Sequence, residues 1–204
     1  MMKALLTILF TASSLAADKD NASQRIDRII SEATTKRWDA TTKADREYRA
    51  AVATTFRFAD RVEVFLIDFS IREDAAYSPK EGDEVFAIRP YNKETKILKK
   101  LKTPPKDIQR WCAAVTKLLT SDKIAGGALC HYPIHGIRIY AGDSLLFETS
   151  ICWGCSNYYF SYEGQATWES LTEDAKDLRA LFGDFMPIPE AEKARFPGAK
   201  PKDK

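Results

Sequence analysis

The segment from residue 135 to residue 151 predicts a β-hairpin, which restricts the fold more than any other part of the sequence. Two runs rich in β-branched and aromatic residues, 137–140 and 145–151, flank a short polar connection. The connection contains Gly142-Asp143, a dipeptide that is typical of a two-residue hairpin turn. The sequence therefore predicts antiparallel pairing in this part of the chain.

A two-residue turn also predicts which residues of the hairpin oppose each other. The numbers of opposed residues then sum to 285, so that His135 lies opposite Ser150, on the same face as Cys152. If pairing continued, Cys130 would lie opposite Cys155. Opposed residues in an antiparallel pair are close enough for a disulfide. The hairpin is therefore expected to bring three cysteines and a histidine to its open end.

Three chemistries remain open for this group. The first is a structural disulfide of Cys130 with Cys152 or Cys155, which suits an oxidising compartment. The second is tetrahedral zinc, with Cys130, Cys152, Cys155 and either His131 or His135 as candidate ligands. The third is thiol–disulfide exchange by the redox pair Cys152 and Cys155. The residues that follow this pair are typical of a strand, whereas a redox pair usually needs a helix N-terminus to stabilise its thiolate.

The fourth cysteine belongs to a different element. Pro104-Pro105 and Asp107 open a predicted helix over 105–120, which places Cys112 on the same apolar stripe as Trp111 and Val115. A cysteine in such a position behaves as a small hydrophobic residue. We predict that Cys112 is a core residue.

The N-terminus has the features of a secretory signal peptide in the expected order. Met1-Met2-Lys3 supplies a positive start, residues 4–10 form a short apolar run, and Ser14-Leu15-Ala16 supplies small residues before a cleavage site. We predict cleavage after Ala16, with Ala17 as the second choice. The mature chain is then exported to the periplasm or secreted, with no stable membrane anchor.

The composition argues against one class of partner. The chain is 29% charged with a formal net charge of +2, and its most basic run, 96–102, alternates with apolar residues. A nucleic-acid-binding surface needs lysines and arginines clustered on one face. We therefore expect no nucleic-acid partner, and the sequence indicates no other partner.

Hydrophobic periodicity predicts an α+β fold. Apolar residues recur at helical spacing over 25–33, 44–55, 105–120 and 172–183, and strand patterns cover 62–69, 84–88, 95–101, 137–140, 145–151 and 156–162. The sequence thus predicts a single α+β domain over 17–189, with an antiparallel sheet of five or six strands packed against helices. The proline- and lysine-bearing tail, 190–204, is expected to be disordered.

Several of these segments together resemble a group of uncharacterised exported bacterial proteins. The shared features are a Val-Glu-Val strand at 62–64 that ends in Ile-Asp, a Cys-x-x-Pro-x-His-Gly-Ile-Arg segment at 130–138, and Ile-Cys-x-x-Cys at 151–155. The likeness covers about residues 60–189. This chain departs from the pattern at Ile134, Trp153 and Gly154, where the group has Arg, Phe and an acid. The resemblance implies export but no particular activity.

Two functional interpretations follow from the sequence. The favoured one is a non-enzymatic exported module for binding or interaction, whose cysteine–histidine hairpin is fixed by a disulfide or by zinc. The alternative is a periplasmic thiol–disulfide redox protein that uses Cys152 and Cys155. Zinc is the one cofactor that the residues suggest, and no other catalytic residues are predicted.

Overall fold

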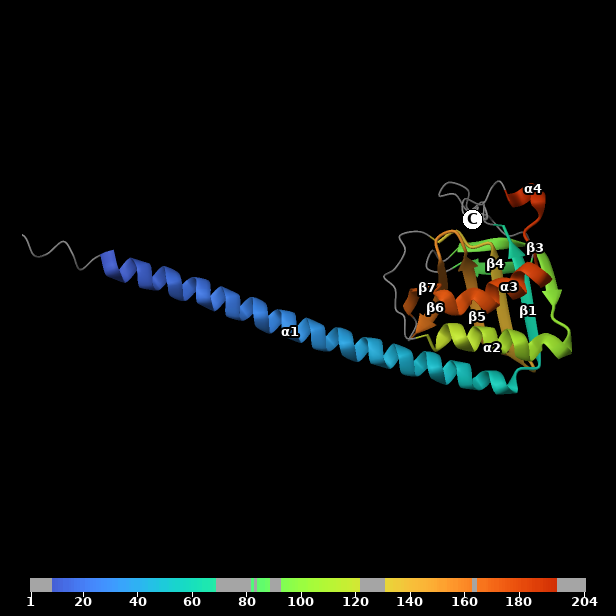
Figure 1. Cartoon of the computed structure of the whole chain (residues 1–204), viewed down its shortest axis with the longest axis horizontal. Helices are drawn as coiled ribbons and strands as arrows, with labels where there is room; N and C mark the ends of the chain where they lie inside the picture. The colour runs from blue at the N-terminus through green and yellow to red at the C-terminus, as the bar shows by residue number, and fades with distance from the viewer. Residues whose placement is uncertain are drawn as a thin grey trace, which may run out of the picture. The chain divides into compact units, whose positions relative to one another are not determined.

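The computed structural model describes residues 9–68, 82, 84–88, 93–121, 131–162 and 165–193. The chain divides into two units, residues 1–46 and 47–204. The first unit is helical wherever it is described, and the second holds the sheet and the helices that cover it (Figure 1). All of the sheet lies in the second unit, and the bounds 17–189 of the single domain stay a prediction.

The first helix, α1, is continuous from Leu9 to Thr55 and crosses the boundary between the units. The prediction of two separate helices at 25–33 and 44–55 was wrong. Residues 9–55 contain neither glycine nor proline, so no residue with a strong preference against helix interrupts the backbone. The predicted cleavage point after Ala16 falls within α1 and stays a prediction.

Seven antiparallel strands form the sheet, in the order β2-β3-β1-β4-β5-β6-β7. The strands are β1 (Arg61–Ile67), β2 (Val85–Ile88), β3 (Lys93–Lys102), β4 (His135–Ala141), β5 (Ser144–Cys152), β6 (Asn157–Tyr162) and β7 (Gln165–Ser170). The antiparallel α+β class is as predicted, but the strand number exceeds the five or six expected. The additional strand, β7, was missed because its sequence, QATWES, lacks the β-branched run that marks the other strands.

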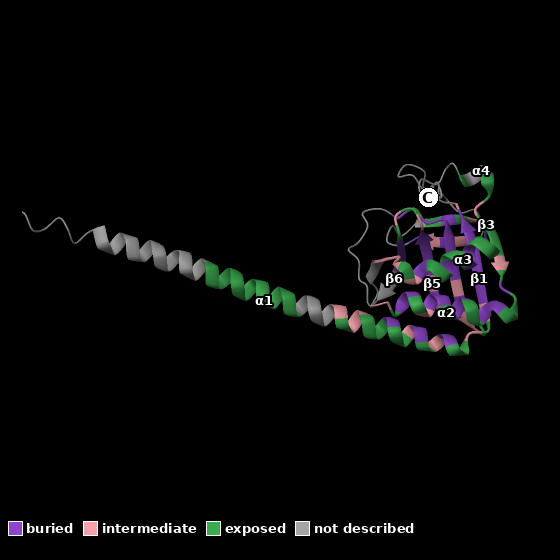
Figure 2. Cartoon of the chain, viewed as in Figure 1, coloured by how far each residue is buried: buried purple, intermediate pink, exposed green. Residues whose placement is uncertain are grey.

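Two helices cover one face of the sheet. They are α2 (Ile108–Leu119), which follows a 3-10 turn at Pro105–Asp107, and α3 (Lys176–Phe185), which lies beside it (Figure 1). Their apolar stripes face β1, β4 and β5, where Val64, Ile137 and Ile139 are fully buried. Figure 2 shows this buried layer in purple between the helices and the strands. Cys112 lies in this core, 3% exposed, as predicted.

A second, smaller core lies on the opposite face of the sheet. It consists of Phe65, Ile67, Phe86 and Ile88, with Ile97 packed against it. Gly136 on β4 lies directly beneath the ring of Phe86. The hairpin of β2 and β3 therefore contacts the back of β4 at a position where no side chain fits.

This close approach leads to a prediction. A Cβ atom at Gly136 would lie 2.5 Å from Cε2 and Cζ of the fully buried Phe86. Gly136→Ala should therefore lower the free energy of unfolding by about 2 kcal/mol through overpacking. Gly183→Ala is the matched control, because nothing lies within 4 Å of the added Cβ in α3. That substitution should raise the free energy of unfolding by about 0.5–1 kcal/mol through helix propensity.

Urea unfolding of the two variants measures the difference. The close packing of Phe86 on β4 is contradicted if both alanines change the stability by the same amount.

The chain after α3 contains one further helical turn. Glu190–Lys193 forms α4, where the sequence predicted the start of a disordered tail. The side chain of Lys193 donates to Glu190 at 2.5 Å within this turn. The remainder of the predicted tail, 194–204, lies outside the described residues.

Candidate functional site

The hairpin of β4 and β5 has the predicted turn, but its register changes after the first two residue pairs. Ala141 opposes Ser144 and Tyr140 opposes Leu145, as a turn at Gly142-Asp143 requires. Between Ile139 and Tyr140 the register shifts, because Leu146 is an extra residue in β5. From there on the numbers of opposed residues sum to 286.

The shift places His135 on the other face of the sheet from Cys152. His135 opposes Ile151, whereas the predicted register paired it with Ser150. Since neighbouring residues of a strand point to opposite faces, His135 faces the main core and not the face that carries Cys152. The prediction that these two side chains share a face was wrong.

His135 is held in the main core by three contacts. Its ring is stacked on Phe182 with centroids 4.5 Å apart, and it is 3% exposed. Nδ1 accepts a hydrogen bond of 2.8 Å from the indole N–H of Trp153. Because the indole can only donate, Nε2 carries the proton and donates to the carbonyl oxygen of Met186 at 2.8 Å. The imidazole therefore joins the β5–β6 turn to the end of α3.

His131 occupies the opposite face, where Cys152 lies. Nδ1 donates to Oδ1 of Asn157 and Nε2 accepts from the hydroxyl of Ser150, both at 2.7 Å. The three side chains are at most 2% exposed. Through these two hydrogen bonds, His131 connects the segment before β4 to β5 and to β6.

Both imidazoles are neutral near pH 7. Burial lowers the pKa of His131 to about 4, and the hydrogen bond with Asn157 offsets only part of this effect. Burial also lowers the pKa of His135 to about 4, against the opposing effect of its bond to Met186. A proton on Nδ1 of His135 would face the N–H of Trp153, so the geometry itself opposes protonation.

The order Ser150, His131, Asn157 matches the relation of a nucleophile, a base and an orienting group in hydrolases. Three properties argue against that role. Ser150 is 2% exposed, so a substrate cannot reach its hydroxyl without movement of the surrounding residues. The lowered pKa makes His131 a weak base, and Asn157 brings no negative charge to stabilise an imidazolium. The group is better explained as a satisfied buried polar network.

Cys152 ends β5 and is a buried free thiol. Its Sγ accepts the backbone N–H of Cys155 at 3.2 Å, within a turn where Ser156 has a φ of 53°. The amides of Tyr132 and Gly154 also bond this sulfur. Burial raises the pKa of the Cys152 thiol, and the three amides lower it by less, so the thiol form is favoured.

The other cysteines differ in state. Cys155 is disulfide-bonded, whereas Cys112 is a buried free thiol whose pKa burial raises to about 11. Cys130, a candidate for both the disulfide and the zinc site, lies outside the described residues. Of the described disulfide candidates, Cys155 is bridged and Cys152 is not.

The predicted zinc ligands are not brought together in the described part of the chain. Both nitrogens of His135 are used in hydrogen bonds, and its ring faces away from the Cys152 side of the sheet. Both nitrogens of His131 are used as well. No group of three or more His, Cys, Asp or Glu among the described residues is placed to share a metal ion.

Several residues of the site were missed in the sequence. These are Ser150, Asn157, Phe182 and Met186. A signal for the true register was present in β4 and β5. A sum of 286 pairs Arg138 with Glu148, which form an ion pair of 2.6 Å, and pairs Ile139 with Phe147. Cross-strand complementarity of this kind favours one register over its neighbour.

The fold and the site together define an antiparallel α+β protein whose cysteine–histidine hairpin is closed by internal hydrogen bonds. No family model, curated protein or solved structure matches this chain. Within the described residues, no helix has the length and hydropathy that a membrane span requires.

Proposed function

We propose that the chain is an exported, non-enzymatic module for binding or interaction. In this proposal the cysteine–histidine hairpin of β4 and β5 is a structural clasp, which means that its side chains hold neighbouring segments of the fold together and carry out no reaction. The observation that carries the proposal is the use of all four imidazole nitrogens in bonds within the chain. A metal-binding histidine needs a nitrogen that is not hydrogen-bonded within the chain, and His131 and His135 offer none. Catalysis by His131 is disfavoured on other grounds, namely the burial of Ser150 and the lowered pKa of the imidazole. The two histidines instead join the segment before β4, the β5–β6 turn and the end of α3.

We further propose that the disulfide of Cys155 is made with Cys130. The chain has four cysteines, and Cys112 and Cys152 are free. Cys130 is therefore the one partner left within the chain. A bridge across these two residues would close a loop around β4 and β5 and stabilise the fold by about 3 kcal/mol.

Mass measurement after alkylation tests the clasp. The denatured, unreduced chain should take up two alkyl groups, and the reduced chain four. Cys155→Ser should free Cys130 and lower the free energy of unfolding by about 3 kcal/mol. Cys152→Ser is the matched control, and it should keep the bridge.

Two results would contradict the clasp. One is zinc in the native protein at one equivalent, and the other is four reactive thiols before reduction.

Thiol–disulfide exchange through Cys152 and Cys155 is the second candidate function. The observation in its favour is that a free thiol, Cys152, receives amide hydrogen bonds three residues from a disulfide-bonded cysteine. The raised pKa of Cys152 opposes it, because only the thiolate attacks a disulfide. Reduction of insulin by dithiothreitol, accelerated by the native protein and not by Cys152→Ser, would favour this function over the clasp.

A further inference from the structure

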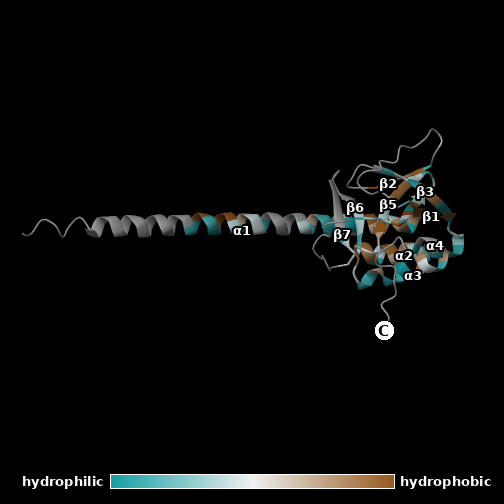
Figure 3. Ribbon diagram, turned by 90° about the horizontal axis from the view of Figure 1, so that it is seen from above, coloured by the Kyte–Doolittle hydropathy of each residue, from teal (hydrophilic) through white to brown (hydrophobic). Residues whose placement is uncertain are grey.

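Residues 24–36 of α1 are exposed without exception, and they include an apolar face (Figure 2). Ile26, Ile29 and Ile30 are 56%, 63% and 58% exposed. Their spacing places them on one side of the helix. Figure 3 shows this hydrophobic stretch of α1 in brown.

An apolar face that stays exposed to water does not add to the stability of its helix. Most helical stability in proteins comes from packing of the apolar face. Three exposed isoleucines in two turns also form a larger apolar patch than scattered surface residues do. The face therefore requires an occupant.

We propose that the occupant is the same helix of a second copy of the chain, packed in antiparallel orientation. In a heptad assignment, Ile26 takes position a, Ile29 takes position d, and Arg25 and Glu32 both take position g. Antiparallel coiled coils place each a residue opposite a d residue of the partner helix. Pairing of Ile26 with Ile29 of the other copy then forms two equivalent apolar layers at the centre.

Charge complementarity supports this pairing. When Ile26 lies opposite Ile29 of the second copy, the flanking g positions place Arg25 beside Glu32 of that copy. The two-fold symmetry repeats the contact, so both flanks carry opposite charges. A parallel pair would instead place Arg25 beside Ile30 and lose this complementarity.

The polar face of the helix agrees with this arrangement. Asp27, Arg28 and Ser31 take positions b, c and f, which point away from the partner in a two-stranded coil. The seam is thus apolar, its g edge is charged, its e edge carries Ile30, and its outer surface is polar. The inference rests on α1 alone and does not depend on the clasp.

The mass of the full chain in solution, measured by light scattering over a wide range of concentrations, tests the inference. The chain should be a dimer at high concentration and dissociate on dilution. Ile29→Asp should abolish the dimer, because it buries a charge opposite an isoleucine. The matched control is Ser31→Asp on the outer face, which should leave the mass unchanged.

Charge reversal tests the antiparallel orientation. Arg25→Glu should weaken the dimer about tenfold, because two attractive contacts become repulsive. Glu32→Arg should act in the same way. The double variant R25E/E32R should restore the original affinity, since each new glutamate again meets an arginine of the other copy. Arg28→Glu on the outer face is the control for a change in net charge.

Circular dichroism of each variant separates loss of pairing from loss of helix. A monomeric mass at every concentration overturns the inference, and so does pelleting of a monomeric chain with lipid vesicles. A dimer that Arg25→Glu weakens and the double variant does not restore overturns the antiparallel register.

Discussion

Acidification from about pH 7 to about pH 5 should lower the free energy of unfolding by about 4 kcal/mol, because both histidines take up protons on unfolding. Burial lowers the pKa of His131 and of His135 from 6.5 to about 4. Between these two values the unfolded chain binds more protons than the folded chain. Stability is therefore complete above pH 6.5 and falls as the pH drops towards 4, by about 2 kcal/mol for each histidine at pH 5.

Urea unfolding at the two pH values, with the variants H131Q and H135Q, measures the share of each histidine. Each variant should lose about half of the difference between the two pH values. In the folded protein, the imidazole signals in nuclear magnetic resonance spectra should not titrate above pH 5. A signal that titrates near pH 6.5 contradicts the buried, neutral state of these rings.

Phe182→Ala should lower the free energy of unfolding by about 4 kcal/mol. The ring of Phe182 is 1% exposed and stacked on His135, and its centroid lies 4.9 Å from Trp111 and 5.9 Å from Trp153. The substitution removes the contact shared by three aromatic rings and leaves a cavity in the core. Phe58→Ala is the matched control, because Phe58 is 61% exposed and its loss should change stability by less than about 0.5 kcal/mol.

Chemical unfolding followed by tryptophan fluorescence measures both variants. The emission of folded Phe182→Ala should also differ from that of the unaltered chain, since two tryptophans lose their neighbour. Equal stabilities of the two variants would contradict a central role for Phe182 in joining α3 to the hairpin.

Much of the fold could be predicted from local patterns. The apolar stripe of α2 and the glycine-containing turn at 142–143 have strong local causes, and both were predicted correctly. The length of α1 and the existence of β7 were not predicted. In α1 the apolar pattern fades between 34 and 43 while the backbone stays helical. In β7 the strand is imposed by pairing with β6.

The location of the site was predictable, but its internal arrangement was not. The crowding of cysteines and histidines pointed to 130–155, and the described parts of that segment form the hairpin and its connections. Which face each side chain takes depends on one extra residue, Leu146, and no turn rule predicts it. The partners on α3, Phe182 and Met186, are set by tertiary packing that the sequence of the hairpin does not contain.

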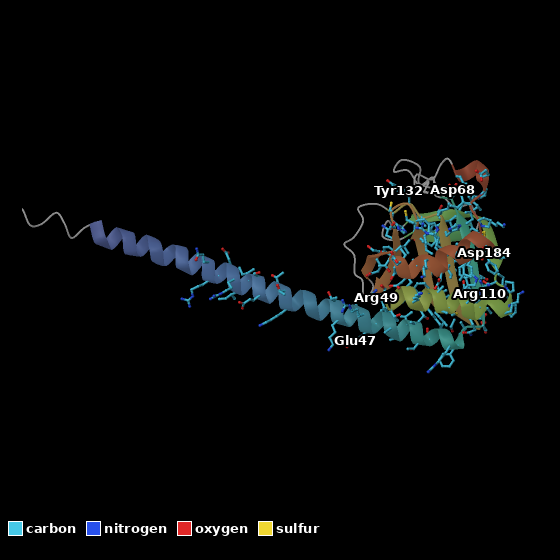
Figure 4. The ribbon with its side chains drawn as sticks, in the orientation of Figure 1. Glu47, Arg49, Asp68, Arg110, Tyr132 and Asp184 are labelled. Atoms are coloured by element: carbon cyan, nitrogen blue, oxygen red, sulfur yellow. The ribbon has the colours of Figure 1, made fainter. Side chains whose placement is uncertain are left out.

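The two faces of the β4–β5 hairpin pack against different parts of the fold. Residues near the open end of the hairpin contact both of these parts. Figure 4 shows Tyr132 and Asp68 at the same end of the strands in that view, and Tyr132 is 48% exposed between the two buried residues His131 and Pro133. Backbone hydrogen bonds also connect segments at this end. The amide of Ile67 donates to the carbonyl oxygen of Ile134, and the amide of Asp68 donates to that of Lys96, each at 2.9 Å. These two bonds connect the end of β1 to β3 and to the segment before β4.

The extra residue in β5, Leu146, interrupts the regular alternation of side chains between the two faces of the sheet. Deletion of Leu146 would keep the residue pairs of the hairpin, because Ile139 would then oppose Phe147 directly after the Tyr140–Leu145 pair. A regular hairpin that kept Leu146 in the ladder would instead move each residue from 147 to 152 to the opposite side of the sheet. Engineers who graft this hairpin onto another scaffold must therefore either keep Leu146 as a bulge or delete it, since the pairs change only if residue 146 enters the ladder. Whether residue 146 is paired, more than its chemical identity, decides which histidine bonds Ser150 and which bonds Trp153.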